Sequence, residues 1–166
     1  MADYILGKDL TDDDITAWAR EAHKYHQQQK TFDRVLNPDY LILGKLGERQ
    51  YSIISGLPMN MSISKWGDGG VDFTASNGRE IDVKTVRINP KPTLYREQNK
   101  RHCEILVLAW ASARTMSAFL LGWTTDEHIV EHGVLEVSPV EGQTHWNHTL
   151  ARSQLWSMDE HWEELL

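Results

Sequence analysis

Apolar and polar residues follow a helical period in two segments of the first 55 positions. In the first segment, Thr11 precedes three aspartates, which places an N-cap and three carboxylates at the positive end of a helix over 11–29. In the second, Asn37 and Pro38 are typical of a helix start, so we predict a helix over 38–55. Its apolar residues form one broad face suited to packing on a sheet: Leu41, Ile42, Leu43, Leu46, Ile53 and Ile54.

After the second helix, the hydrophobic pattern changes to a period of two residues. Alternating apolar and polar residues predict a strand over 59–64. A short strand over 71–75, the hairpin turn Asn77-Gly78 and a returning strand over 80–87 follow. We therefore predict that these three strands form a meander.

The second half of the chain continues with a basic segment, two apolar strands and a mixed acidic tail. The segment over 93–102 follows two prolines and is predicted to be a helix or loop. The unbroken apolar run over 105–109 is typical of a buried strand, and a further strand is predicted over 117–123. The order of elements predicts an α/β (α+β mixed) fold with a central mixed β-sheet flanked by helices.

The composition is that of one domain. The chain has 166 residues, of which 40% are hydrophobic, and no Pro/Gly-rich segment is long enough to separate two units. We predict a single domain over 1–166, with a core at about 38–124 and with the helix at 11–30 and the acidic tail at 125–166 as additions.

Cysteine content and apolar runs indicate the compartment. Cys103 is the single cysteine, so no disulfide within the chain and no cysteine pair for zinc can form. No apolar run approaches the ~20 residues that cross a bilayer, and the N-terminal segment is acidic where a secretory signal is basic. These observations predict a cytoplasmic protein without a membrane partner and with a thiol that is buried or idle.

The net charge of -7 argues against a nucleic-acid partner, but its distribution does not. Residues 84–101 carry six lysines and arginines against Glu97 alone, whereas residues 125–166 carry nine acidic residues against Arg152 alone. The chain is therefore polarised into a basic middle and an acidic tail. Two solvated faces would give the same pattern.

Two aspartates and a lysine are predicted to meet at the hairpin. Alternation places Asp82 and Lys84 on one face of the returning strand, and the turn brings Asp72 on the partner strand toward Asp82. Two neighbouring carboxylates repel each other unless a cation lies between them, and their hard oxygens suit Mg²⁺ or Mn²⁺. An ordinary surface ion pair is the alternative.

Four segments in chain order resemble the PD-(D/E)xK nuclease superfamily. The segment around Glu48 (44–48) resembles its helix-borne glutamate motif, 70–73 its first aspartate strand, and 81–85 its signature tripeptide strand, while 121–124 is similar to a strand that often closes the core. The resemblance covers about 40–123. Val71 stands where the family name has proline, and Asp82 stands where glutamate is commoner.

The resemblance implies a restriction-endonuclease-like core and a catalytic set formed by Glu48, Asp72, Asp82 and Lys84. It implies that Asp72, Asp82 and the Val83 carbonyl hold Mg²⁺, with Mn²⁺ able to substitute, and that Glu48 binds a second metal or orients water. Lys84 would contact the attacking water, and its two carboxylate neighbours favour the charged ammonium, which suits an orienting group better than a base.

The function implied is that of a hydrolase, a deoxyribonuclease whose endo or exo action stays open and whose products carry 5′-phosphate and 3′-hydroxyl ends. We expect it in phage or bacterial DNA processing, and hence in a bacterial or host cytoplasm. The basic segment would position the DNA backbone, through Arg87, Lys91, Arg96, Gln98, Lys100 and Arg101. Trp66 could stack on bases beside the site.

Two other functions remain open. A catalytically inactive nucleic-acid-binding module on the same fold would bind DNA without metal. A protein-binding adaptor would use the acidic tail to contact a basic partner and would not bind DNA. The tryptophans of the tail, at 134–166, are also compatible with a homodimer surface or with a flap over the core.

Overall fold

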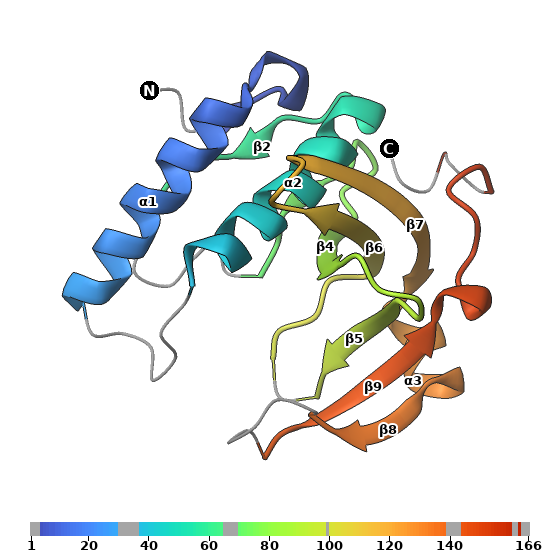
Figure 1. Ribbon diagram of the computed structural model, residues 1–166. Helices are drawn as coiled ribbons and strands as arrows, with labels where there is room; N and C mark the ends of the chain where they lie inside the picture. Colours follow the sequence, from blue (N-terminus) through green and yellow to red (C-terminus); the bar gives the residue numbers. More distant parts are fainter. Residues whose placement is uncertain are drawn as a thin grey trace.

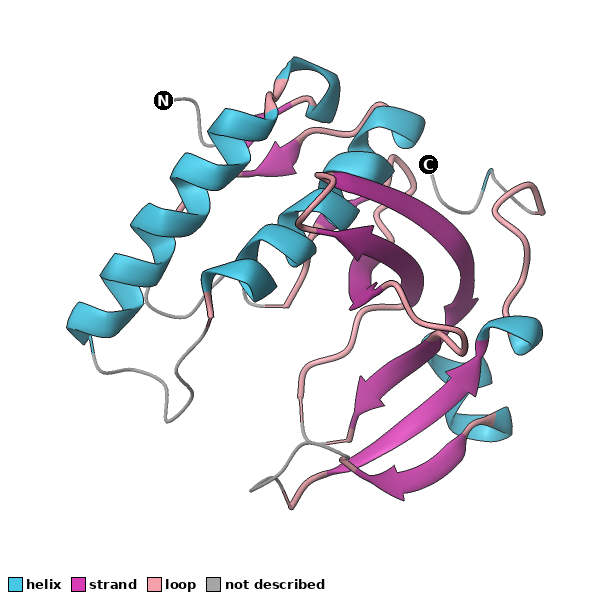
Figure 2. Ribbon diagram, viewed as in Figure 1, coloured by secondary structure: helices cyan, strands magenta, loops and turns pink. Residues whose placement is uncertain are grey.

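The computed structural model describes residues 4–29, 37–64, 70–98, 100–138, 144–160 and 163. They form a mixed α/β fold with three α-helices and three sheets (Figures 1 and 2). The helices are α1 (Asp12–Gln29), α2 (Pro38–Ser55) and α3 (Asp126–His132), and the 3-10 helices are η1 (Gly7–Asp9) and η2 (Arg152–Gln154). The strands are β1 (Tyr4–Ile5), β2 (Met59–Asn60), β3 (Phe73–Thr74), β4 (Glu80–Arg87), β5 (Thr93–Glu97), β6 (Ile105–Ser112), β7 (Ser117–Thr125), β8 (Val134–Val137) and β9 (Trp146–Ala151).

The two long helices begin at their predicted caps. The Thr11 hydroxyl accepts from the Asp14 N–H at 3.2 Å, and the Asp14 carboxylate accepts from the Thr11 N–H at 2.8 Å. The Asn37 side chain accepts from the Asp39 N–H at 3.0 Å, and α2 ends at Gly56 in the left-handed conformation (φ 73°). These local bonds confirm both predicted helices. In the described residues, no helix is long and apolar enough to cross a membrane.

The central sheet has the strand order β3-β4-β6-β7. β4 runs parallel to β6, while the β3–β4 and β6–β7 pairs are antiparallel, so the sheet is mixed as predicted. The predicted Asn77-Gly78 turn joins β3 to β4, with Gly78 at φ 86° and the Asn77 side chain accepting from the Arg79 N–H. The buried apolar run forms β6 in the middle of the sheet, and this position explains why it lacks a polar face.

Different layers cover the two faces of this sheet (Figure 1). On one face, Tyr51 of α2 packs with Ile81, Val83 and Val107. The opposite face packs on the three-stranded sheet of order β5-β9-β8 and on α3, through a cluster formed by Val86, Leu94, Leu106, Leu108, Leu121, Ile129, Leu150 and Leu155. The central sheet is thus enclosed between helices and a second sheet.

Three sequence predictions for the strands are wrong. The strand predicted over 59–64 is the short β2, which pairs with β1, so the predicted meander reduces to the β3–β4 hairpin. The basic segment predicted as a helix or loop contains β5, because Leu94 pairs with Leu150 of β9 and is buried between the sheets. The acidic tail supplies the other two strands of the second sheet, with β9 paired to β5 and β8 paired to β9.

The predicted apolar face of the second helix is also too broad. Leu43 and Leu46 are buried, but Ile53 and Ile54 at the C-terminal end of α2 are about half exposed. Tyr51 and Ser52 occupy the buried positions of that last turn instead. Contacts with β4, and not hydrophobicity alone, therefore determine which residues of α2 are buried.

Candidate metal and nucleic-acid site

The orientation of β4 decides which residues can form a site. Gly47 of α2 lies so close to β4 that a Cβ there would come within 1.9 Å of the Thr85 hydroxyl. Thr85 therefore faces α2, together with Ile81 and Val83. Because side chains alternate along a strand, Asp82 and Lys84 lie on the opposite face of β4. The second sheet covers that face further along the strand.

Asp82 and Lys84 form an ion pair, with Lys84 Nζ and Asp82 Oδ2 2.5 Å apart. The Asp82 side chain is 13% exposed and the Lys84 side chain 43% exposed. Val86, two residues further along the same face, packs into the cluster between the two sheets. The pair therefore lies where the covering sheet leaves part of β4 open to solvent.

Asp72 reaches the same place from the neighbouring segment. Its N–H donates to the Ile81 carbonyl at 3.0 Å, and its Oδ2 accepts from the Val83 N–H at 2.7 Å. In a strand, the N–H and C=O of one residue point to the same side, so the Val83 carbonyl points toward the edge where Asp72 lies. β3 pairs only with Glu80 and Ile81, so the edge of β4 beyond them has no strand neighbour among the described residues.

Electrostatics keep Lys84 charged. Burial lowers the pKa of the Lys84 ammonium, but the charge of Asp82, its hydrogen bond to Lys84 and the charge of Asp72 together raise that pKa above its ordinary value. Both carboxylates therefore act on one ammonium. This matches the predicted charged state of Lys84.

Cys103 is a neighbour of the site that the sequence did not reveal. Its buried thiol donates to the Gly70 carbonyl at 3.0 Å, in the segment that leads to Asp72. Burial raises the pKa of this thiol to about 12, and the negative charges of Asp82 and Asp72 add to the effect. The thiol is thus buried as predicted, but it supports the segment that carries Asp72.

The donor set fits a hard divalent cation only in part. Two carboxylates and a backbone carbonyl at one strand edge offer the oxygen ligands that Mg²⁺ takes, with positions left for water. The described ranges contain no group of three or more His, Cys, Asp or Glu side chains placed to hold a metal. The oxygen ligands that could hold a cation here are therefore those of Asp72, Asp82 and the Val83 carbonyl, rather than those of a cluster of three carboxylates.

Glu48 forms an ion pair with a lysine of its own helix. Its Oε2 is 2.5 Å from Lys45 Nζ on the same helix, and both side chains are buried. Lys45 also donates to the Asn60 carbonyl at 2.9 Å and lies over the ring of Trp18, 4.7 Å from its centroid. The Lys45–Glu48 pair is therefore enclosed by α1, α2 and β2 on the helical side of the central sheet.

Three of the predicted DNA-contacting cations have carboxylate partners within the chain. Arg96 binds both oxygens of Asp126 and its side chain is 11% exposed, so it joins β5 to the start of α3. Lys100 pairs with Glu97 at 2.8 Å, and Arg101 pairs with Glu80 at 2.5 Å, near the start of β4.

The remaining predicted contacts differ in their surroundings. Gln98 is exposed, and its N–H donates to the Trp146 carbonyl at 2.9 Å. Arg87 and Lys91 are exposed and form no ion pair with any described residue, although the Arg87 guanidinium lies 4.8 Å from the ring centroid of Tyr40. Trp66 lies outside the described residues.

No protein-family model matches the sequence, and no curated protein matches it either. The chemistry of the site therefore rests on its geometry. A partly exposed ammonium beside two carboxylates can attract an anion only when a further cation offsets the carboxylates. That requirement favours a site for a metal together with a phosphate.

Proposed function

We propose that this protein is a divalent-metal-dependent nuclease of the PD-(D/E)xK type, which hydrolyses DNA phosphodiester bonds on a restriction-endonuclease-like core. The observation that carries the proposal is the meeting of Asp72, Asp82 and the Val83 backbone at an open strand edge, beside the partly exposed Lys84. The mixed sheet with α2 on one face agrees with such a core. The proposed setting is phage or bacterial DNA processing in the cytoplasm.

The proposal gives each residue a defined task. Asp72, Asp82 and the Val83 carbonyl would hold Mg²⁺, which supplies charge neutralisation and a more acidic bound water. Lys84 is held by Asp82 with its pKa above the ordinary value, so it acts as a charged group that stabilises the phosphate rather than as a base. The role of Glu48 as a metal or water ligand stays a prediction. Its ion pair with Lys45 favours a structural role instead.

The test is cleavage of linear, circular, single-stranded and branched DNA in Mg²⁺, Mn²⁺ and EDTA. We expect cutting in both metals and none in EDTA, and we expect Asp82→Asn to lower the rate by at least about 100-fold, the cost of losing one preorganised charged group in an active site. Asp13→Asn, an exposed carboxylate on α1, is the matched control and should cut normally. Survival of circles would identify exonuclease action, and products that DNA ligase can rejoin would establish the proposed ends.

Two results would replace this proposal. Binding of DNA without cutting in any metal would indicate the inactive nucleic-acid-binding module. The absence of DNA binding at every salt concentration would indicate the protein-binding adaptor.

A homodimer also stays a proposal. β8 is an edge strand of the second sheet, and its apolar residues Val134, Leu135 and Val137 are exposed beside Trp146. An exposed apolar edge of this kind is able to pair with a second copy. Sedimentation would show a concentration-dependent dimer that Val137→Lys abolishes, and a monomer at high concentration would overturn the idea.

A further inference from the structure

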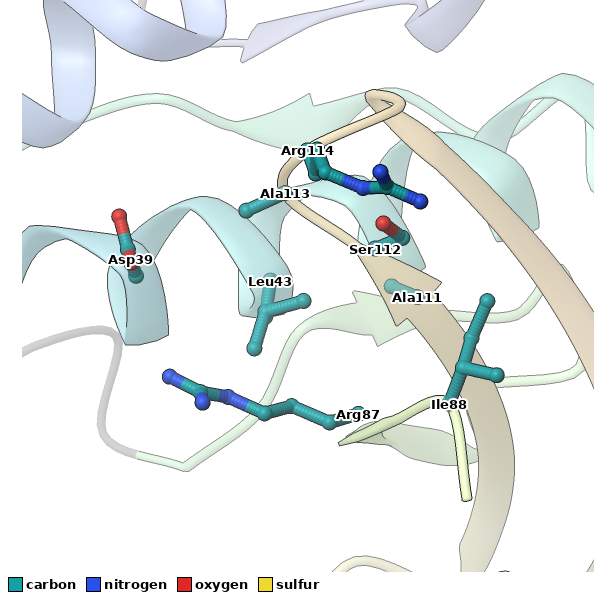
Figure 3. Close-up of a pocket in the computed structure, with 8 residues that line it drawn as sticks. All are labelled: Asp39, Leu43, Arg87, Ile88, Ala111, Ser112, Ala113 and Arg114. Atoms are coloured by element: carbon teal, nitrogen blue, oxygen red, sulfur yellow. The ribbon is translucent and has the colours of Figure 1, made fainter. Parts of the chain in front are cut away.

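A pocket lies where the end of β4, the turn after β6 and the first turn of α2 meet (Figure 3). Its volume is about 280 Å³. Leu43 and Ala111 line it with apolar surface, and Arg87 and Arg114 lie on opposite sides of them in Figure 3. Ser112 adds a hydroxyl to the lining. Apolar side chains thus separate the two arginines, whose guanidinium groups point in opposite directions in Figure 3.

The two arginines differ from three others in the chain. Arg49, Arg96 and Arg101 each bind a carboxylate, on Asp12, Asp126 and Glu80 respectively. Neither Arg87 nor Arg114 forms an ion pair with a described residue, although Asp39 also lines the pocket. With two arginines and one aspartate in its lining, the pocket has a net positive charge.

One further feature favours an anion there. The contact with the Tyr40 ring orients the Arg87 guanidinium without neutralising it. The first turn of α2 adds little attraction, because the Asp39 carboxylate already lies at the positive end of that helix.

We infer that this pocket binds a backbone phosphate of the nucleic acid, at a distance from the bond that is cut. The inference rests on the proposed function and extends it. Arg87 is five residues beyond Asp82 on β4, which corresponds to about 16 Å along the strand. Alternation places Arg87 on the α2 face with Val83, opposite the face of Asp82, so the polynucleotide would pass from the open edge of β4 onto the α2 face.

The spacing sets the length of DNA involved. B-form DNA rises about 3.4 Å along its axis for each base pair, so about 16 Å along the axis spans roughly five base pairs. Arg114 lies in the turn between β6 and β7, outside the basic segment of the sequence. It is therefore a DNA-contacting residue that charge patterning could not identify.

The experiment measures binding of the full chain to a 30-base-pair duplex in EDTA, over a series of salt concentrations. Each phosphate contact that is lost lowers the slope of log K against log salt by about 0.9. Because both arginines are proposed to contact one phosphate, we expect a decrease of up to about 0.9 for Arg87→Gln and for Arg114→Gln, and no more than about 0.9 for the double variant. Arg114→Lys keeps the charge and should keep most of the slope.

Arg20→Gln is the matched control, because Arg20 is an exposed arginine of α1 without an ion pair to a described residue. Slopes of both pocket variants equal to that of Arg20→Gln would overturn the inference. If the wild type cuts DNA and the pocket variants keep the wild-type slope, the proposed nuclease function is supported and the proposed phosphate pocket is contradicted. If the pocket variants lower the slope but the wild type does not cut DNA, the phosphate pocket is supported and the nuclease function is contradicted. If the protein does not bind DNA, both proposals are contradicted.

Discussion

Two lysine–carboxylate pairs lie on opposite sides of the central sheet, and each has the same separation of 2.5 Å. In the Lys45–Glu48 pair, the side chains are only 7% and 11% exposed. In the Lys84–Asp82 pair, the lysine is 43% exposed. The geometry of the two pairs is therefore alike, and their access to solvent differs.

The neighbours of each lysine explain what this difference means. Lys45 is enclosed by the Asn60 carbonyl and the Trp18 ring, so its charge is used within the fold. Lys84 faces a second carboxylate, Asp72, and opens to solvent at the strand edge. A short lysine–carboxylate contact does not by itself identify a functional site. The second carboxylate and the open edge make that distinction here.

The largest effect on stability is expected at the enclosed pair. Lys45→Met removes the cation beside the buried Glu48 carboxylate and should lower the free energy of unfolding by about 3 to 5 kcal/mol. Urea denaturation measures this change. The double variant Lys45→Met/Glu48→Leu removes both charges and should recover most of the loss. A loss below about 1 kcal/mol in the single variant would mean that the pair is not structural.

A smaller effect is expected where α2 meets β4. Gly47→Ala places a methyl group against the Thr85 hydroxyl and 3.1 Å from the Ala109 Cβ, and should lower the free energy of unfolding by about 1 to 3 kcal/mol. Gly44→Ala is the matched control in the same helix, because its Cβ would meet nothing within 4 Å. That substitution should raise stability by up to about 1 kcal/mol. Equal effects of the two substitutions would contradict the close contact that fixes the orientation of β4.

The open pair should contribute little to stability. Lys84→Met should change the free energy of unfolding by less than about 1 kcal/mol, because the pair is partly solvated, while cleavage falls by at least about 100-fold. The raised pKa of Lys84 sets the sign of the pH dependence: the contribution of the pair is complete below about pH 10 and is lost only as the pH rises through the folded-state pKa. Unfolding curves at several pH values measure it. A large loss of stability in Lys84→Met at neutral pH would contradict this prediction. It would mean that the Lys84–Asp82 pair has a structural role like that of the Lys45–Glu48 pair.

The smallest expected signal is the reactivity of Cys103. With a buried thiol and a pKa of about 12, almost no thiolate is present at pH 8, so iodoacetamide should not label the native protein on the timescale of labelling in guanidinium. Mass spectrometry measures the extent of labelling. Rapid labelling of the native protein would show that the segment beside Asp72 opens readily.

The sequence predicted those parts of the fold that depend on local signals. Caps at Thr11 and Asn37 defined the helices, and the Asn77-Gly78 turn defined the hairpin that brings Asp72 to the Val83 N–H beside Asp82. Alternation along β4 predicted that Asp82 and Lys84 share a face, which their ion pair confirms. These features depend on residues that are close together in the chain.

The features that the sequence did not predict depend on distant partners. β5 is a strand because Leu94 meets Leu150, and Arg96 is engaged because α3 presents Asp126. Cys103 approaches Gly70, and Arg114 lines the same pocket as Arg87, only through the packing of the sheet. Charge counting assigned the basic residues to DNA, but it could not reveal which of them already have partners in the chain.

The second sheet has a consequence for the order of folding. β5 acquires its partner β9 only after some fifty more residues have been synthesised, whereas the β3–β4 hairpin needs only segments that precede β5. Closing the longer loop costs more chain entropy and is slower than forming the hairpin. On the ribosome, the face that carries Asp82 and Lys84 would therefore remain uncovered until β9 emerges. The acidic tail contributes no predicted ligand to the site, but it completes the surroundings of that site.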